Sequence, residues 1–539
     1  MRRSGFLNVR KMNSSLKYTL FFAVAFTIAR AAIGKESPTP PQNVRALSRQ
    51  LRVDIVWDSI ETPLYYEVRR ARKADGAFEP LPAQLTNANV NAYCDFIGES
   101  GSNLFYKVRS VRRDKDGNAD AFSDWSAVCH ASPLPLETSQ LVTEVQEAGF
   151  RYFYDYGHPV SGLARVGTRK KPDVCSSGSV GWAMHNIVVG VERGFITREQ
   201  AVQRAAKMLR FLSSRADRFH GAFPHWLDGA TGRTIPFSQY DDGADIVETA
   251  YLMEGVLLLR EYFSSRSAGE KEIRRLADFL WRSVEWTWFA QEQNGRNYLL
   301  WHWSPNYGWF QNHAISGFNE CQIVYVLALA SPTHPVSPKC YWQGWQSGSY
   351  ANPRTEFGIS LELGRDIGPP LFWTEYSYLG FDPCQISFHG KTYFEHFQNF
   401  CRVDLLYAKS RSDQFKGYGP LWGWTAGYGP SGYKAYAPGP RDDGTINPSA
   451  ALSSMPYVPE DSRAFLAELY VKHGRDFWGP FGFYDAFNLS RDWLARDYLA
   501  NEVGPIGPMI ENSRSGICWK TFMQAPEIAV ALKIISSPP

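Results

Sequence analysis

The stretch Ser238-Gln-Tyr-Asp-Asp-Gly-Ala-Asp-Ile-Val-Glu-Thr-Ala250 runs directly into the apolar segment Tyr251-Leu-Met-Glu-Gly-Val-Leu-Leu-Leu259. A helix over the second segment is apolar on nearly all sides, so we expect it to be largely buried. In the first segment, Asp241, Asp245 and Glu248 are spaced i, i+4 and i+7. On an α-helix this spacing places the three carboxylates within an arc of roughly 60°. The sequence therefore predicts a buried helix with an acidic cluster on one face.

This acidic cluster has a functional and a structural interpretation. Like charges on a buried face repel each other and lose hydration, which is costly unless a cation, hydrogen-bond donors or a shared proton compensates. Raised carboxyl pKa values are what acid/base chemistry at a sugar ring requires. Capping of the helix start is the better explanation for Asp241 and Asp242 taken alone, because Ser238 and Asp241 stand in capping-box spacing and acidic residues suit a first helical turn. Capping does not explain Glu248, roughly two turns inside, so we predict a functional role for Asp245 and Glu248 together.

The composition points away from charged partners and towards carbohydrate. With 21% charged residues and a formal net charge of +3, no strong field indicates nucleic acid or a membrane surface. Aromatic residues make up 15% of the chain and gather in Gly- and polar-rich loops, notably at 301–309 and 417–430. Flat rings with hydroxyl, amide and indole donors suit the C–H faces and hydroxyl edges of sugars. Taken as a set, these loops predict a ring-lined cleft.

The N-terminus predicts export. Basic residues up to Lys17 precede the apolar run 20–29, and Ala29-Arg-Ala31 fits a signal cleavage site. We therefore expect a signal peptide at 1–34, no membrane span after cleavage, and a periplasmic or extracellular location, with a retained anchor as the alternative.

Eight cysteines are dispersed without a CxxC pair, so zinc-type ligand spacing is absent. The scattered histidines lack HxH or HExxH spacing, and this favours hydrogen bonding over metal binding. We predict neither a metal nor a cofactor. Cys94 and Cys129 could pair after export.

Two kinds of periodicity divide the rest of the chain. Alternating, strand-like runs and turns occupy 38–133, and this segment resembles a fibronectin type III β-sandwich through its proline entry, Trp57 and the Ser123-Asp-Trp-Ser126 ending. No catalytic constellation lies there. Helical periodicity fills 137–535, where ten to twelve apolar faces are separated by Gly-, Pro- and aromatic-rich loops. We expect one closed α-toroid here, with a pair of helix bundles as the alternative.

Long motifs in the second segment are similar to the glucoamylase-like (glycoamylase) family. They are Arg151–Ala164, Gly190–Arg198, Arg218–Trp226, Pro236–Thr249, Trp301–Trp309, Phe318–Cys321 and Met509–Gly516. The resemblance covers nearly all of 137–535 and implies an (α/α)6 toroid, so the expected fold is mainly α with a small β-sandwich before the toroid. The family includes bacterial β-1,2-glucan hydrolases that invert anomeric configuration, so the resemblance implies this activity. Because its members differ in endo or exo action, the resemblance leaves the mode of action open. Tyr240 and Phe318 depart from the Lys and Trp usual at these positions.

Carried over residue by residue, the resemblance makes Asp241, Asp245, Glu248 and Glu320 the functional carboxylates. We expect Glu320, just before the apolar run 323–329, to be the general acid. The general base is expected in the other three, with Asp245 as first choice. Substrate contacts are expected from His225, Trp226, Trp301, His302, Trp303, Tyr307, Trp309, Glu511 and Arg514. For Glu511 a structural ion pair is an equal alternative.

The predicted function is an exported inverting hydrolase of β-glucan, with β-1,2 linkages as the first expectation. A transglycosylase or glucan-cyclising enzyme could use the same carboxylates. A polysaccharide lyase would need a Tyr or His base beside a neutralised uronate, and the acidic cluster argues against it because acids repel an acidic substrate. A non-catalytic glycan-binding protein would bind glucans without releasing reducing ends.

Overall fold

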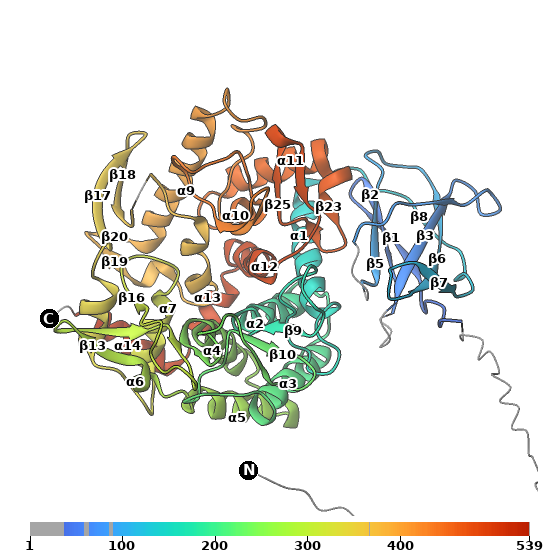
Figure 1. Cartoon of the computed structure of the whole chain (residues 1–539). Helices are drawn as coiled ribbons and strands as arrows, with labels where there is room; N and C mark the ends of the chain where they lie inside the picture. The colour runs from blue at the N-terminus through green and yellow to red at the C-terminus, as the bar shows by residue number, and fades with distance from the viewer. Residues whose placement is uncertain (1–36, 59–63, 86–89, 366, 538–539) are drawn as a thin grey trace, which may run out of the picture. The chain divides into compact units, whose positions relative to one another are not determined.

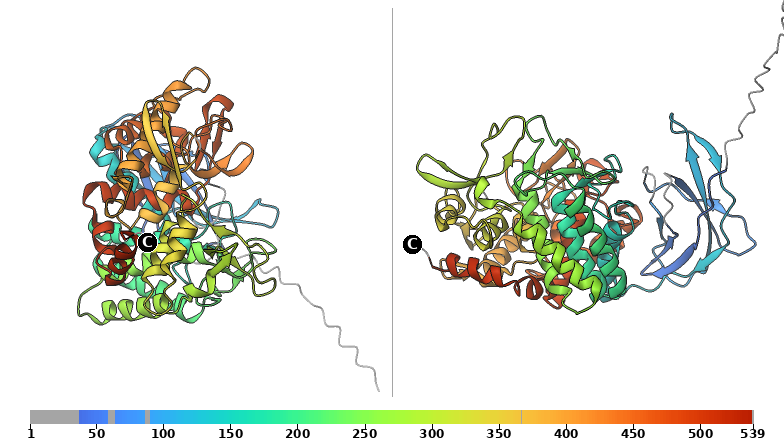
Figure 2. Two further views of the ribbon diagram at one scale, coloured as in Figure 1. Left: turned by 90° about the vertical axis from the view of Figure 1, so that its left-hand side faces the viewer. Right: turned by 90° about the horizontal axis from the view of Figure 1, so that it is seen from below.

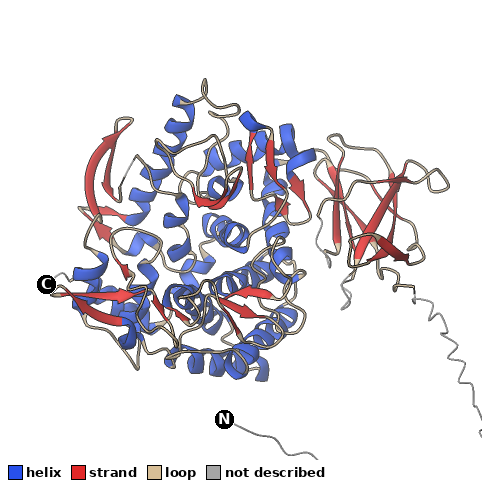
Figure 3. Ribbon diagram, in the orientation of Figure 1, coloured by secondary structure: helices blue, strands red, loops and turns tan. Residues whose placement is uncertain are grey.

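The computed structural model describes residues 37–58, 64–85, 90–365 and 367–537. Strands fill its N-terminal part and helices dominate from residue 138 onwards (Figures 1 and 3). The predicted signal peptide at 1–34 lies outside the described residues. Within the described ranges, no helix has both the length and the apolar character of a membrane span.

Residues 45–131 form a β-sandwich of two antiparallel sheets. The first sheet has the order β1-β2-β5, and the second has the order β4-β3-β6-β7 with β8 paired to β6. The strands are β1 (Arg45–Arg49), β2 (Arg52–Val56), β3 (Tyr65–Ala71), β4 (Glu79–Pro80), β5 (Ala92–Phe96), β6 (Leu104–Arg113), β7 (Ala119–Phe122) and β8 (Cys129–Ala131). Alternate residues Leu104, Tyr106 and Val108 of β6 point into a core that also holds Ile55 and Trp57.

The described residues from Thr138 to Ile535 form an (α/α)6 toroid, whose helices follow one another around a ring in Figure 1. The helices are α1 (Thr138–Tyr154), α2 (Ser177–Glu192), α3 (Arg198–Ser214), α4 (Ile246–Tyr262), α5 (Ala268–Arg282), α6 (Trp286–Phe289), α7 (Gln322–Ala330), α8 (Pro338–Cys340), α9 (Tyr393–Ser410), α10 (Pro448–Ser453), α11 (Pro459–Phe477), α12 (Ala500–Arg514), α13 (Ile517–Phe522) and α14 (Pro526–Ile535). One apolar core runs through all of them, so the alternative of two bundles is wrong.

Burial separates inner from outer helices. The inner helices α2, α4, α7, α10 and α12 are buried around most of their circumference, and all nine residues of α7 are buried. The outer helix α5 buries one stripe, Ile273, Leu276, Ala277, Leu280 and Trp281, and exposes the opposite face. The sequence of α5 therefore specifies an outer position, whereas the apolar sequence of α4 specifies an inner one.

Helices α2 and α4 pack backbone against backbone and are neighbours in Figure 1; Figure 2 shows the same ring of helices from two other sides. A Cβ at Gly181 would lie 2.0 Å from the carbonyl oxygen of Tyr251, and one at Gly255 would lie 2.4 Å from the carbonyl oxygen of Gly181. Only glycine permits this approach. It holds the two helices close together, and their first turns carry part of the site described below.

The helix predicted to carry all three acidic residues begins later than expected. Helix α4 starts at Ile246, and Asp245 is its N-cap, with its side chain accepting from the N–H groups of Val247 and Glu248. Asp241 lies before the helix, in a turn closed by the N–H of Phe237 donating to the carbonyl of Asp241. The helical i, i+4, i+7 alignment is therefore wrong, because Asp245 satisfies the free N–H groups of the helix start instead of lying within the helix.

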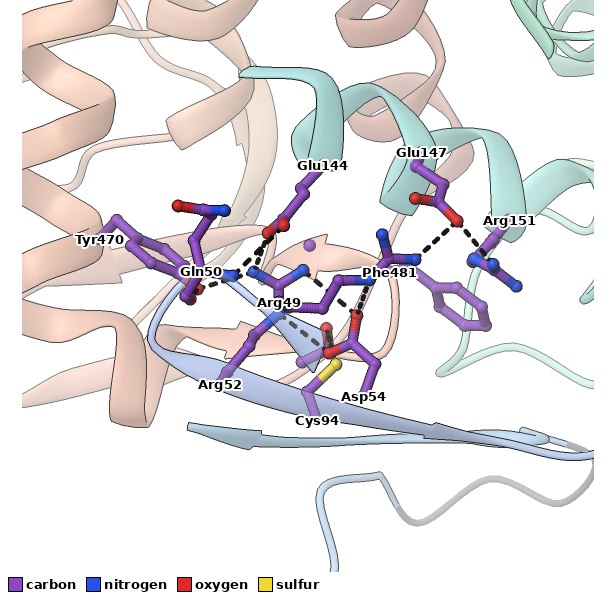
Figure 4. A network of polar contacts seen from close by, with 12 residues as sticks. Arg49, Gln50, Arg52, Asp54, Cys94, Glu144, Glu147, Arg151, Tyr470 and Phe481 are labelled. Atoms are coloured by element: carbon purple, nitrogen blue, oxygen red, sulfur yellow. Dashed lines mark hydrogen bonds and ion pairs between the residues drawn. The ribbon is translucent and has the colours of Figure 1, made fainter. Parts of the chain in front are cut away.

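The β-sandwich is attached to the toroid by a buried polar network (Figure 4). Arg52 of β2, 1% exposed, donates to Glu144 of α1 at 2.6 Å and to Tyr470 of α11 at 2.7 Å. Its guanidinium also lies 4.5 Å from the ring centre of Trp478. Phe96 packs so closely on Gly474 that a Cβ there would lie 2.4 Å from the ring. Sandwich residues such as Phe96 thus belong to the toroid core.

All eight cysteines are free thiols. Cys94 donates to the carbonyl of Gly479 at 3.2 Å, and Cys129 lies 3.8 Å from the carbonyl of Tyr106. The pairing of Cys94 with Cys129 is therefore not formed in this structure.

Candidate active site

Asp245 is fixed by hydrogen bonds on both carboxylate oxygens. Its Oδ1 accepts from the N–H groups of Val247 and Glu248, each at 3.0 Å, and its Oδ2 lies 2.9 Å from Nδ1 of His225. Asp245 is completely buried. Burial raises its pKa, but the hydrogen bond from His225 and the charge of His302 outweigh burial and lower that pKa below the ordinary value.

Glu248 lies one turn further along α4, at the N-terminus of α2. Its Oε2 accepts from the hydroxyl of Ser176 and from the N–H of Gly178, both at 2.7 Å. A Cβ at Gly178 would lie 2.8 Å from this oxygen, so glycine is what lets the carboxylate reach the helix start. Burial and the charge of Asp245 raise the pKa of Glu248, although His225, with Nε2 3.9 Å from Oε1, opposes the shift.

A second histidine pairs with the remaining acid of the cluster. His302 lies on β15 (His302–Trp303), which pairs with β12 (Ala244–Asp245). Its Nδ1 is 3.3 Å from Oδ2 of Asp241 and 3.8 Å from Oδ2 of Asp245. Burial disfavours the charged ring, but the two aspartates outweigh burial and raise the pKa of His302. Two histidine–aspartate pairs therefore lie side by side, and His225 also approaches Glu248.

Glu320 reaches the site from a different part of the ring, two residues before α7. Its backbone carbonyl accepts hydrogen bonds from the hydroxyls of Ser377 and Tyr251, the latter at 3.2 Å. Burial raises the pKa of the Glu320 carboxyl to about 7. A carboxyl group with this pKa holds its proton in a substantial fraction of molecules at neutral pH, as a general acid requires.

Glu248 and Glu320 line one cavity of about 630 Å³. Of the predicted contact residues, His225, Trp226 and Trp301 also line it. Asp241, Asp245 and His302 are not among its lining residues. His302 pairs with both aspartates, and Asp245 also pairs with His225. The arrangement brings together two carboxyl groups with raised pKa values and an aromatic wall, which suits acid/base chemistry on a sugar.

This placement changes the candidate base. Asp245 is fully buried, both of its oxygens are hydrogen-bonded, and its pKa is lowered, so it has neither the access nor the basicity to activate a water in the cavity. Glu248 lines the cavity and has a raised pKa. The geometry therefore favours Glu248 over Asp245 as the candidate base, with Asp245 placed to orient the ring of His225.

The other predicted contacts divide into two groups. The first group lies outside the cavity lining and consists of Trp303, Tyr307 and Trp309. The ring centre of Trp303 lies 5.0 Å from that of His220, and Tyr307 is 44% exposed.

Glu511 and Arg514 instead tie α12 to its neighbours. Glu511 is fully buried and pairs with Arg193 at 2.7 Å, while Arg514 donates to Gln146 at 2.6 Å. Neither residue is among those that line the cavity, and the pair with Arg193 is the structural ion pair that was the alternative for Glu511.

Several residues that line the cavity were not predicted from the sequence. The hairpin of β21 (Ala426–Gly429) and β22 (Gly432–Ala435) places Tyr428 and Tyr433 in the cavity lining. Asn501 also lines the cavity. Tyr433 is 56% exposed, so the cavity reaches the surface. The aromatic-rich loop at 417–430, which was predicted to line a cleft, contains Tyr428 but ends before Tyr433. Two further lining residues, Tyr251 and Tyr376, lie in apolar or aromatic runs that are typical of a buried core, so the sequence did not indicate a role in the cavity.

His225, Asp241 and Asp245 could also hold a divalent ion, because one ligand atom from each lies within 4.8 Å of the others. The observed hydrogen bond between His225 and Asp245 already pairs two of the three ligand atoms. A bound ion would have to displace this bond and deprotonate the ring.

Known proteins resemble this chain over most of its length. The Glycoamylase family model, described as "Putative glucoamylase", matches residues 312–526. An exo β-1,2-glucooligosaccharide sophorohydrolase of Parabacteroides distasonis is 37% identical over 517 residues, which is 92% of this chain and 70% of that protein. The crystal structure of a β-1,2-glucanase from Parabacteroides distasonis has a TM-score of 0.87 at 37% identity and covers 94% of this chain and 74% of its own. An endo-β-1,2-glucanase from Chitinophaga pinensis has a TM-score of 0.71 at 42% identity, with coverage of 74% and 98%. The chain therefore belongs to the glycoamylase family.

Proposed function

We propose that this protein is an exported glycoside hydrolase that cleaves β-1,2-linked glucan with inversion of anomeric configuration. The observation that carries the proposal is the presence of Glu320 and Glu248 in one aromatic-walled cavity, with the pKa of Glu320 raised to about 7. The β-1,2 linkage rests on the relatives described above, an exo-acting sophorohydrolase and an endo-β-1,2-glucanase. Export rests on the N-terminal sequence pattern alone.

In the proposed mechanism, Glu320 donates its proton to the glycosidic oxygen as the bond to the anomeric carbon breaks. Glu248 accepts a proton from a water molecule that attacks the opposite face of the sugar. Ser176 and the N–H of Gly178 hold one oxygen of Glu248, which leaves Oε1 for the water. The cation of His225 stabilises the ionised form of Glu248 until it takes the proton.

The test is an incubation of the mature protein with linear β-1,2-, β-1,3-, β-1,4- and α-1,4-glucans, followed by chromatography of the products. We expect release of short oligosaccharides from the β-1,2-glucan only. Proton NMR of the first product should show the α-anomer before mutarotation. A β-anomer would contradict inversion, and larger or cyclic products at high oligosaccharide concentration would indicate transglycosylation instead of hydrolysis.

A further inference from the structure

Three aromatic rings form an exposed patch that the proposed mechanism does not use. The rings of Tyr240 and Phe310 stack with centres 4.2 Å apart at 29°, and Tyr307 meets Tyr240 edge-on at 5.1 Å. Phe310 is 63% exposed and Tyr307 is 44% exposed. We call Tyr240, Tyr307 and Phe310 the aromatic platform. Contiguous exposed apolar patches are typical of surfaces that bind a ligand or a partner.

The aromatic platform is held rigidly by polar contacts between its two loops. Asp242, two residues beyond Tyr240, accepts from the amide of Asn306 at 2.6 Å and from the hydroxyl of Ser304. Ser304 and Gly308 exchange two backbone hydrogen bonds, at 3.0 and 2.8 Å, which close the turn that carries Tyr307. A ligand therefore meets rings that are already in place, and binding requires little ordering of the protein.

The aromatic platform continues from the wall of the cavity. Phe237 lines the cavity, and its ring centre lies 4.2 Å from that of His225 and 4.8 Å from that of Trp226. The N–H of Phe237 donates to the carbonyl of Asp241, so Phe237 and Tyr240 share one tight turn. The turn that carries Tyr240 of the aromatic platform therefore also supplies part of the cavity lining.

We propose that the aromatic platform binds glucosyl units of the same β-glucan chain that extend beyond the cavity, and so favours long substrates over short ones. This inference rests on the proposed function. A cavity of about 630 Å³ holds only a short oligosaccharide, so the rest of a longer chain lies on the surface. The ring faces suit the C–H faces of glucose, and the hydroxyls of Tyr240 and Tyr307 with the amide of Asn306 supply hydrogen-bonding groups at the edges.

The kinetic test compares substrate lengths in Tyr240→Ala and Phe310→Ala. We expect the ratio of kcat/KM for long β-1,2-glucan to kcat/KM for the shortest cleaved oligosaccharide to fall about tenfold, mainly through KM, as expected for losing one ring contact. Phe279→Ala removes another exposed ring, 47% exposed on α5, and is the matched control with an unchanged ratio. An equal loss on all lengths, or none on the long glucan, would overturn the proposal.

A binding test separates this proposal from the proposed function. In a Glu320→Gln background, affinity electrophoresis in gels containing β-1,2-glucan measures binding without turnover. We expect retardation that Tyr240→Ala weakens and Phe279→Ala does not. If the wild type cleaves no β-1,2-glucan but retardation still depends on Tyr240, the proposed function is contradicted, whereas glucan binding by the aromatic platform is supported. If Tyr240→Ala leaves retardation unchanged but converts an oligomer to a monomer in analytical ultracentrifugation, the surface binds a second copy and the proposal is overturned.

Discussion

The ring of His225 connects Asp245 to the cavity wall, with Nδ1 lying 2.9 Å from Oδ2 of Asp245. On the other side of the ring, Nε2 lies 3.9 Å from Oε1 of Glu248. Burial disfavours the charged imidazolium, but Glu248 and the hydrogen bond to Asp245 outweigh burial and raise the pKa of His225 to about 9. At neutral pH the ring is therefore cationic, and it offsets the repulsion between the two carboxylates.

Replacing His225 by Asn should shift the acidic limb of the pH profile of kcat/KM to higher pH. Without the cation, the charge of Asp245 raises the pKa of Glu248 further, and the base is lost at a higher pH as the solution is acidified. The measurement is kcat/KM from pH 4 to 9. A uniform drop in activity with an unshifted acidic limb would contradict the electrostatic role of His225.

The alkaline limb of the same profile should report Glu320. The acid works only when protonated, so activity should fall as pH rises through about 7, the pKa that burial gives this group. Glu320→Gln should lower kcat by about 10²–10⁴-fold, the range for losing a general acid, while circular dichroism stays unchanged. Near-native turnover of a folded Glu320→Gln protein would remove Glu320 from the mechanism.

Two substitutions, Glu248→Gln and Asp245→Asn, should distinguish the general base from the residue that positions His225. Glu248→Gln removes the candidate base from the cavity and should abolish most turnover with little change in Tm. Asp245→Asn keeps an N-cap but loses the charge that pairs with His225, so it should lower both Tm and kcat. If Asp245→Asn lowers kcat as far as Glu248→Gln does and leaves Tm intact, the base assignment returns to Asp245.

Removal of divalent ions should leave turnover unchanged. His225 and Asp245 already share a hydrogen bond, and the charge of His225 is balanced by neighbouring carboxylates, so the group needs no metal for electrostatic compensation. The assay is turnover after dialysis against EDTA, with Zn²⁺ and Ca²⁺ added back as separate arms. Loss of activity that one ion restores would show that the histidine–aspartate group is a metal site.

The sequence could predict the architecture because the distribution of apolar residues around each helix indicates how much of that helix is buried. The apolar run after Ala250 specifies an inner helix, and the amphipathic stripe of α5 specifies an outer one. The acidic spacing indicated carboxylates that the structure brings close together, but it predicted the wrong local structure, because Asp245 is an N-cap. Periodicity does not show where a helix starts when a side chain competes for its free N–H groups.

The far wall of the cavity could not be predicted for a different reason. Tyr433 and Asn501 meet Glu248 only through closure of the ring, and their positions depend on contacts between segments far apart in the chain. A single tyrosine in a Gly-rich hairpin carries no periodic signal of function. The attachment of the β-sandwich likewise depends on Arg52, whose partners Glu144 and Tyr470 lie 92 and 418 residues away.

Arg52→Ala should destabilise the whole protein, because it leaves Glu144 buried without its cation. Breaking a buried pair in this way lowers the free energy of unfolding by about 3–5 kcal/mol. The matched control is Arg210→Ala, which removes an exposed ion pair with Glu272 and should change stability by less than about 1 kcal/mol. Urea denaturation followed by tryptophan fluorescence measures both variants. If Arg52→Ala unfolds the β-sandwich in a separate early step while the toroid keeps its native midpoint and activity, the buried network attaches the sandwich without stabilising the toroid.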